Sequence, residues 1–153
     1  MSDRIKLHLG CGRVIIPDAV NVDILPLDQV DVRRDLNVMP WPWEDGGVYE
    51  IIANHLVEHL ACGMVAFMDE CWRLLLPGGT VYIEVPDAAD LDLAWCDPTH
   101  VRPYRTHSFV NYFTIPGIKH FHYTDRAWSI LHCSTDGRVV RFHGMPVPPE
   151  HAR

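Results

Sequence analysis

The amino-terminal part of the chain combines a short β-type run with a connection that has almost no room for a helix. From Ile5 to Leu9 apolar and polar residues alternate, and the run stops at Gly10 and Gly12. This pattern is typical of a strand that ends in a glycine turn. Only seven residues separate Gly12 from the next β-type run, and one of them is Pro17. We therefore expect a first crossover that is made by coil.

Later segments repeat the alternation of strand and helix. Apolar residues fall at helical spacing between Gly63 and Leu76, and Pro77 with two glycines predicts the end of this helix. A strand, a helix, a tight turn and a strand in that order predict a parallel crossover. Besides the first run, the β-type runs are 20–24, 30–34, 49–54 and 80–85.

The second half of the chain predicts a long loop and a hairpin. Residues 86–117 carry four prolines and no clear period, except for one or two helical turns at 109–113. The β-type runs 127–133 and 138–143 flank an Asp-Gly pair, which favours a hairpin turn. The expected fold class is a three-layer α/β sandwich, with a mostly parallel sheet, a C-terminal antiparallel hairpin and a shortened first crossover. We expect one domain, residues 1–144, followed by a tail, residues 145–153.

Size and charge restrict the class of partner. The 153 residues carry 13 Lys and Arg against 20 Asp and Glu, a formal charge of −7. The length and the 48% of hydrophobic residues fit a single globular core. A negative mean charge offers no broad cationic face to a phosphate backbone, so a nucleic-acid partner is disfavoured.

The cysteines and the apolar runs indicate the compartment. Five scattered cysteines without a CxxC pair predict a reduced environment, with neither a structural zinc knuckle nor a disulfide framework. No stretch has the length of a signal peptide or of a membrane span. We expect a soluble cytoplasmic protein that has no membrane partner.

Polar residues and glycines stand at three successive strand ends. In open α/β sheets small molecules bind beyond the carboxyl ends of the strands, where Gly10 and Gly12 lie. Asp23 closes the second strand and offers its carboxylate to a ribose diol, and Asp35 closes the third, within reach of an adenine amino group. A plain tight turn and solvated strand ends are the alternatives for each feature alone. The occurrence of the glycine turn and the two aspartates at three successive strand ends favours a nucleoside ligand.

The glycine turn also restricts which nucleoside ligand fits. A dinucleotide needs a third glycine and a helix N-terminus for its pyrophosphate, but Ile15 stands at the third position and the helix is missing. S-adenosylmethionine has no phosphate and carries a cationic sulfonium. An acidic protein without the phosphate site suits it.

The order of motifs resembles the class I S-adenosylmethionine-dependent methyltransferases, in their small methyltransferase-domain subgroup. The resemblance runs from Ile5 to Asp87 and fades beyond it. It is carried by LHLGCG, NVDI, DLNVMPWPWED, YEIIANHLVEHL, FMDECWRLLLPGG and VYIEVPD. It implies a Rossmann-like fold and an enzyme that transfers a methyl group from S-adenosylmethionine to an acceptor by in-line displacement. The acceptor, a small molecule or a macromolecule, is not identified by the sequence.

The resemblance also implies which residues bind the cofactor. Leu9, Gly10, Cys11 and Gly12 would line its methionine end, Asp23 would bind the ribose, and Ile24 would pack on the adenine. Asp35 and Leu36 would flank the adenine, while Asn54 and His55 would approach the methionine and the sulfonium.

The segment His55-x-x-Glu58-His59 has the spelling of an H-x-x-E-H zinc-hydrolase signature. That signature needs both imidazoles on one helix face. Here the segment directly follows a strand, so His55 is expected in the turn, away from His59. No ExxxE or ExxxH helix stands nearby to supply a third ligand. We therefore expect no metal, and keep a zinc hydrolase as a remote alternative.

The loop after the last parallel strand supplies the catalytic candidates. His100 is a candidate general base, because an imidazole titrates near working pH. Asp97 is a candidate partner for it, and His59 is a further catalytic candidate. The alternatives are that Asp97 and His100 only stabilise a turn, and that His59 only begins a helix.

Alternative hypotheses concern the activity and the acceptor site. Because the first crossover is short, a catalytically inactive cofactor-binding module that serves as a subunit or scaffold is the alternative to an active enzyme. Nothing after the hairpin forms a recognition domain, so either the acceptor is small or a second copy or partner subunit completes the pocket. Trp41 and Trp43 are expected to cap the sheet edge, with part of an apolar acceptor pocket as the alternative.

Overall fold

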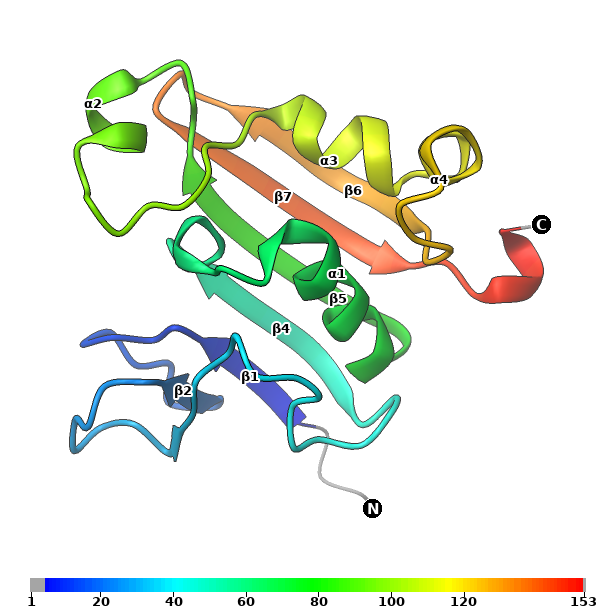
Figure 1. Cartoon of the computed structure of the whole chain (residues 1–153). Helices are drawn as coiled ribbons and strands as arrows, with labels where there is room; N and C mark the ends of the chain where they lie inside the picture. The colour runs from blue at the N-terminus through cyan, green and yellow to red at the C-terminus, as the bar shows by residue number, and fades with distance from the viewer. Residues whose placement is uncertain (1–4, 153) are drawn as a thin grey trace.

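The computed structural model describes residues 5–152 and contains one seven-stranded sheet in the order β3-β2-β1-β4-β5-β7-β6 (Figure 1). Strands β1 to β5 pair in parallel, and β7 pairs antiparallel with both β5 and β6. The strands are β1 (Ile5–Leu9), β2 (Val20–Asp23), β3 (Val32–Arg33), β4 (Val48–Asn54), β5 (Leu75–Pro86), β6 (Trp128–Thr135) and β7 (Val139–Pro146). The predicted Rossmann-like sheet with a C-terminal hairpin and a helix-free first crossover is confirmed.

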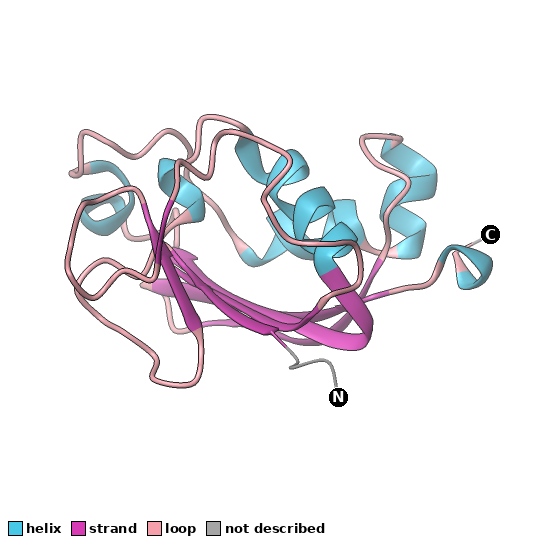
Figure 2. Ribbon diagram, turned by 90° about the horizontal axis from the view of Figure 1, so that it is seen from below, coloured by secondary structure: helices cyan, strands magenta, loops and turns pink. Residues whose placement is uncertain are grey.

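The helices lie on one side of the sheet (Figure 2). They are α1 (Gly63–Leu74), α2 (Leu91–Trp95), α3 (Thr106–Phe113) and α4 (Ile115–Phe121), with two 3-10 turns, η1 (Val57–His59) and η2 (Pro149–His151). The other face of the sheet carries no helix within the described residues, because the connections that follow β1, β2 and β3 contain none.

The segment 86–117 is more helical than predicted. It holds α2, all of α3 and the start of α4. Phe109 and Phe113 are buried one helical turn apart, and the Phe109 ring stacks on Phe142 of β7 with centroids 4.7 Å apart. The apolar stripe of α3 is only two residues long, so the sequence period was too short to reveal the whole helix. β7 runs to Pro146, so the hairpin includes the first two residues of the expected tail.

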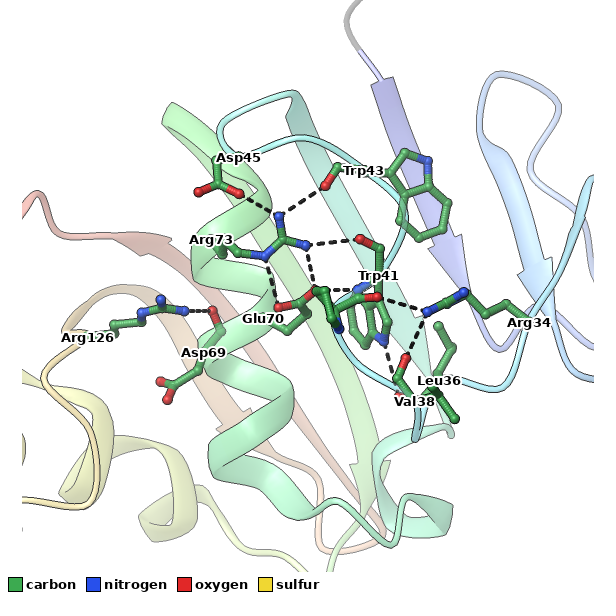
Figure 3. Close-up of polar contacts among 11 residues, drawn as sticks. Arg34, Leu36, Val38, Trp41, Trp43, Asp45, Asp69, Glu70, Arg73 and Arg126 are labelled. Carbon is green, nitrogen blue, oxygen red and sulfur yellow. Dashed lines mark hydrogen bonds and ion pairs between the residues drawn. The ribbon is translucent and has the colours of Figure 1, made fainter.

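The long coil between β3 and β4 is held by the charged end of α1 (Figure 3). Arg73 donates to the carbonyls of Trp41 and Trp43, to Asp45 Oδ1 and to both oxygens of Glu70. Glu70 in turn accepts the Trp41 N–H at 2.6 Å. Burial opposes ionisation of Glu70, but these bonds more than offset it, so the pKa of Glu70 is lowered. This network fixes the coil that leads into β4.

Trp41 does not cap the sheet edge, as the sequence led us to expect. It is 2% exposed, packs edge-on against Phe67 of α1, and donates its Nε1–H to the Leu36 carbonyl. An indole with a partner for its N–H fills a core position at little polar cost. Trp43 is partly buried against the same core.

No helix within 5–152 is long and apolar enough to span a membrane.

Replacing Glu70 by Gln should destabilise the fold by about 3 kcal/mol at neutral pH, because it leaves the Arg73 guanidinium without its buried counter-charge. The lowered pKa of Glu70 gives stability that is complete above its unfolded-state pKa of about 4.5 and is lost as the pH falls through the folded value. Urea denaturation at pH 7 and pH 3 measures both effects. Glu44→Gln, at an exposed site on the same coil, is the control. A Glu70→Gln penalty that is as large at pH 3 as at pH 7 would contradict the ion-pair account.

Candidate functional site

The turn after β1 needs glycine at its first position. Gly10 and Gly12 have φ angles of +66° and +52°, in the left-handed region that favours glycine. A Cβ on Gly10 would also lie 2.8 Å from Leu56 Cδ1, whereas one on Gly12 would meet nothing within 4 Å. The backbone at Gly10 therefore lies directly against the chain that follows β4.

Asp23 ties this turn to the neighbouring strand. Its Oδ2 accepts the Gly12 N–H at 2.8 Å, and its Oδ1 accepts the Leu25 N–H at 2.9 Å. The residue is 8% exposed, and a fixed carboxylate of this kind keeps a free lone pair on each oxygen. Because Leu9 pairs with Val22 in register, the ends of β1 and β2 lie side by side.

A pocket of about 180 Å³ opens at these strand ends. Five of the predicted cofactor residues line it, and they come from three successive strand ends, as the sequence pattern required. Its lining residues are Gly10, Asp23, Ile24, Arg34, Asp35, Leu36, Asn37, Leu56, His59 and Leu60. Larger hollows lie elsewhere, such as one of about 460 Å³ beside Trp72 and Arg126, but they contain none of the predicted cofactor residues.

The other predicted cofactor residues do not line the pocket. Leu9 and Cys11 are buried, with 0% and 4% exposure, so they support the turn from below. Gly12 bonds Asp23 at the side of the turn. Asn54 ends β4, and its Oδ1 is buried without a hydrogen-bond partner.

His55 forms the turn out of β4, with a φ of +51°. Its Nδ1 lies 3.4 Å from Glu58 Oε1, and this carboxylate raises the pKa of His55. Only one 3-10 turn, Val57–His59, follows it. The H-x-x-E-H segment therefore does not form the helix on which a zinc-hydrolase signature depends, and His55 lies in the turn as expected.

Sequence reasoning did not assign Arg34, Asn37, Leu56 or Leu60 to the pocket. Only their position in the sequence could have indicated that they line the pocket, because each follows the end of β3 or β4 by a few residues. Leu56 matters most, since its side chain packs over Gly10 and narrows the space above the glycine turn.

The three predicted catalytic residues meet in a second cluster beside the pocket. The rings of His59 and His100 are 4.6 Å apart between centroids. His59 Nδ1 is 2.8 Å from the Thr99 hydroxyl, which donates to Asp97 Oδ1 at 2.6 Å. Asp97 thus connects to His59 through Thr99, while its Oδ2 stays 3.9 Å from His100 Nε2. Because His59 also lines the pocket, the two clusters adjoin.

Comparisons with known proteins bear on the fold. No protein-family model matches the sequence, and no curated protein matches it significantly. A SAM-dependent methyltransferase from Archaeoglobus fulgidus superposes with a TM-score of 0.65 at 15% identity, over 92% of this chain and 85% of that one. A protein assigned as a methyltransferase from Bacillus halodurans C-125 gives 0.58 at 15% identity, over 94% and 90%. The antibiotic-resistance methyltransferase Kmr gives 0.56 at 12% identity, over 95% and 88%.

The chain has the fold of the class I S-adenosylmethionine-dependent methyltransferases. At 12–15% identity this likeness concerns the fold alone.

Gly10→Ala should destabilise the protein by about 1–3 kcal/mol more than Gly12→Ala, because only the first adds a clash to the backbone strain. Chemical denaturation of both variants measures the difference. In a Leu56→Ala background the difference should shrink, since the contacts with Leu56 Cδ1 and Cγ are gone and only the one with Cβ, at 3.0 Å, is left. Equal costs for the two glycines in the original background would show that Leu56 does not lie over Gly10.

Proposed function

We propose that this protein binds S-adenosylmethionine at the ends of β1, β2 and β3 and transfers its methyl group to an acceptor held beside His59. The supporting observation is the convergence of the glycine turn, the fixed Asp23 carboxylate and Asp35 on one pocket. In folds of this class, ligands bind outside the carboxyl ends of parallel strands.

The residues present fit the cofactor's parts. Gly10 leaves backbone without a side chain at the floor of the pocket, and the lone pairs of Asp23 suit a ribose diol. Ile24 is 54% exposed at the rim, an apolar surface for an adenine ring. The partnerless Asn54 Oδ1 offers an acceptor for an ammonium group.

The pocket is small for such a ligand. About 180 Å³ is below the roughly 300–1,000 Å³ of usual small-molecule sites. Leu56 accounts for part of this difference, because it covers Gly10. Binding therefore requires the Leu56 side chain to move aside, which a residue in a coil between β4 and η1 can do at modest cost.

The residues of the protein hold the cofactor and orient the acceptor. The cofactor, when bound, supplies a methyl group that its sulfonium already activates. Asp23 and the glycine turn hold the nucleoside, so that the methyl group keeps one orientation. Catalysis rests on presenting the acceptor in line with it, and a base is needed only for poorly ionised acceptors. His59, at the border between pocket and loop, is the residue that we assign to the acceptor side.

Asp23→Asn should weaken S-adenosylmethionine binding by about 1.5–3 kcal/mol, which is about 10- to 150-fold, because a charged hydrogen-bond acceptor for the ribose is lost. The amide oxygen still accepts one backbone N–H, so the turn is disturbed less than by Ala. Isothermal titration calorimetry measures the affinity, with Asp28→Asn, at an exposed site, as the matched control. An unchanged affinity in Asp23→Asn, or no binding by the unaltered protein, would refute the site.

Transfer activity is tested by incubating the protein with labelled S-adenosylmethionine and fractionated cell extract. We expect a product heavier than its acceptor by about 14 Da, one methyl replacing hydrogen. His59→Asn should lower the rate about 100-fold while cofactor affinity stays within about 2-fold, because this residue acts on the acceptor side. The exposed His120→Asn serves as control. Saturable cofactor binding without transfer to any fraction would indicate a non-catalytic binding module instead.

A further inference from the structure

Glu58 carries a buried carboxylate that has no hydrogen-bond partner. Its side chain is 2% exposed, and neither of its oxygens takes part in a hydrogen bond. The one charged neighbour within ion-pair distance of it in the described residues is the half-exposed His55, whose Nδ1 lies 3.4 Å from Glu58 Oε1 without a hydrogen bond. A buried carboxylate without a partner is costly, and such groups in proteins are paired or coordinate metals. Because the ion pair with His55 leaves both Glu58 oxygens without a hydrogen bond, the carboxylate has the capacity to bind a positive ligand.

Two imidazoles converge on this carboxylate. One ligand atom each from Glu58, His59 and His100 lie within 4.8 Å of one another. The residues come from η1 and from the loop after α2, and the Val101 N–H, which donates to the Glu58 carbonyl at 2.7 Å, holds the two segments together. Donors bind a divalent ion at about 2.1 Å, so closing this set around an ion requires shifts of about 1 Å.

The hydrogen bonds of both histidines leave the same ring nitrogen free. His100 Nδ1 lies 2.9 Å from the Ala94 carbonyl, which can only accept, so this nitrogen carries the proton. The Thr99 hydroxyl gives its proton to Asp97, so its oxygen accepts from His59 Nδ1. Neutral imidazoles with a protonated Nδ1 have a lone pair on Nε2. Metal-binding histidines are oriented in this way by carbonyl and carboxylate partners.

The geometry points to a binding site for a first-row divalent transition-metal ion, formed by Glu58 and by Nε2 of His59 and His100. Two imidazoles and one carboxylate suit ions such as Zn²⁺, Co²⁺ or Mn²⁺ better than the all-oxygen preference of Mg²⁺ or Ca²⁺. The H-x-x-E-H spelling predicted a different set, since it paired His59 with His55 and missed His100. The proposal differs from the sequence-based expectation of no metal.

Three protein ligands leave coordination positions open. His59 lines the cofactor pocket, so the site adjoins the place where a methyl acceptor has to stand. We assign to the ion the role of binding an oxygen of that acceptor, and this role, unlike the metal site itself, rests on the proposed function. A catalytic metal of this type typically has three protein ligands and one exchangeable position.

The test uses the full chain without a histidine tag, freed of metal by chelation. Titration with Co²⁺, followed by its visible absorption and by calorimetry, should give one ion per chain. Glu58→Gln should abolish this saturable binding, and Thr99→Val, which removes the partner of His59, should weaken it about 10- to 100-fold. Glu44→Gln and His120→Asn, at exposed sites outside the cluster, should bind Co²⁺ like the unaltered protein.

A second measurement is the melting temperature, which can be compared between the variant and the unaltered protein even where the variant binds no metal. Without metal, Glu58→Gln should melt at or above the temperature of the unaltered protein, because the buried charge that it removes has no hydrogen bond and only the half-exposed His55 as ion-pair partner. Added Co²⁺ should raise the melting temperature of the unaltered protein only. No Co²⁺ binding, or equal binding by Glu58→Gln, would overturn the metal site. Titration of S-adenosylmethionine in the presence of chelator reports separately on the cofactor pocket, so a failure of either proposal is seen on its own.

Discussion

The site depends on a connection that joins two parallel strands without a helix. Residues 10–19 lead from β1 to β2 as coil, so their backbone polar groups need partners other than helical ones. Side chains of β2 provide them. Asp23 accepts the Gly12 N–H, and Asn21 accepts the Ile16 N–H while donating to the carbonyls of Ile16 and Ala19. One short strand thus holds both the glycine turn and the rest of the crossover.

The same replacement of helices by side chains shapes the rest of this edge of the sheet. Arg73 and Glu70 of α1 hold the coil between β3 and β4, which carries Asp35 and Leu36 to the pocket. Hydrogen bonds from buried or half-buried charged groups are stronger than neutral ones, so few residues suffice. As a result, the helices cover only one side of the sheet (Figure 2).

The sequence predicted the features that rest on local pattern. The glycine turn, the parallel strands, α1 and the final hairpin follow from periodicity and turn residues, and the convergence of Gly10, Asp23 and Asp35 follows from the geometry of parallel strands. Contacts between distant segments were beyond it. The core position of Trp41 depends on Phe67, and the cover of Gly10 depends on Leu56. The meeting of His100 with Glu58 depends on how the loop after α2 folds back, which no local pattern encodes.

The central claim is that the glycine turn and Asp23 grip a nucleoside. A crystal structure of the protein grown with S-adenosylhomocysteine tests it most directly. We predict ribose hydroxyls within hydrogen-bond distance of Asp23, the Leu56 side chain rotated away from Gly10, and the adenine against Ile24. Ligand density at another part of the surface, or a saturated crystal in which Leu56 still covers Gly10 with no ligand beside it, would contradict the account.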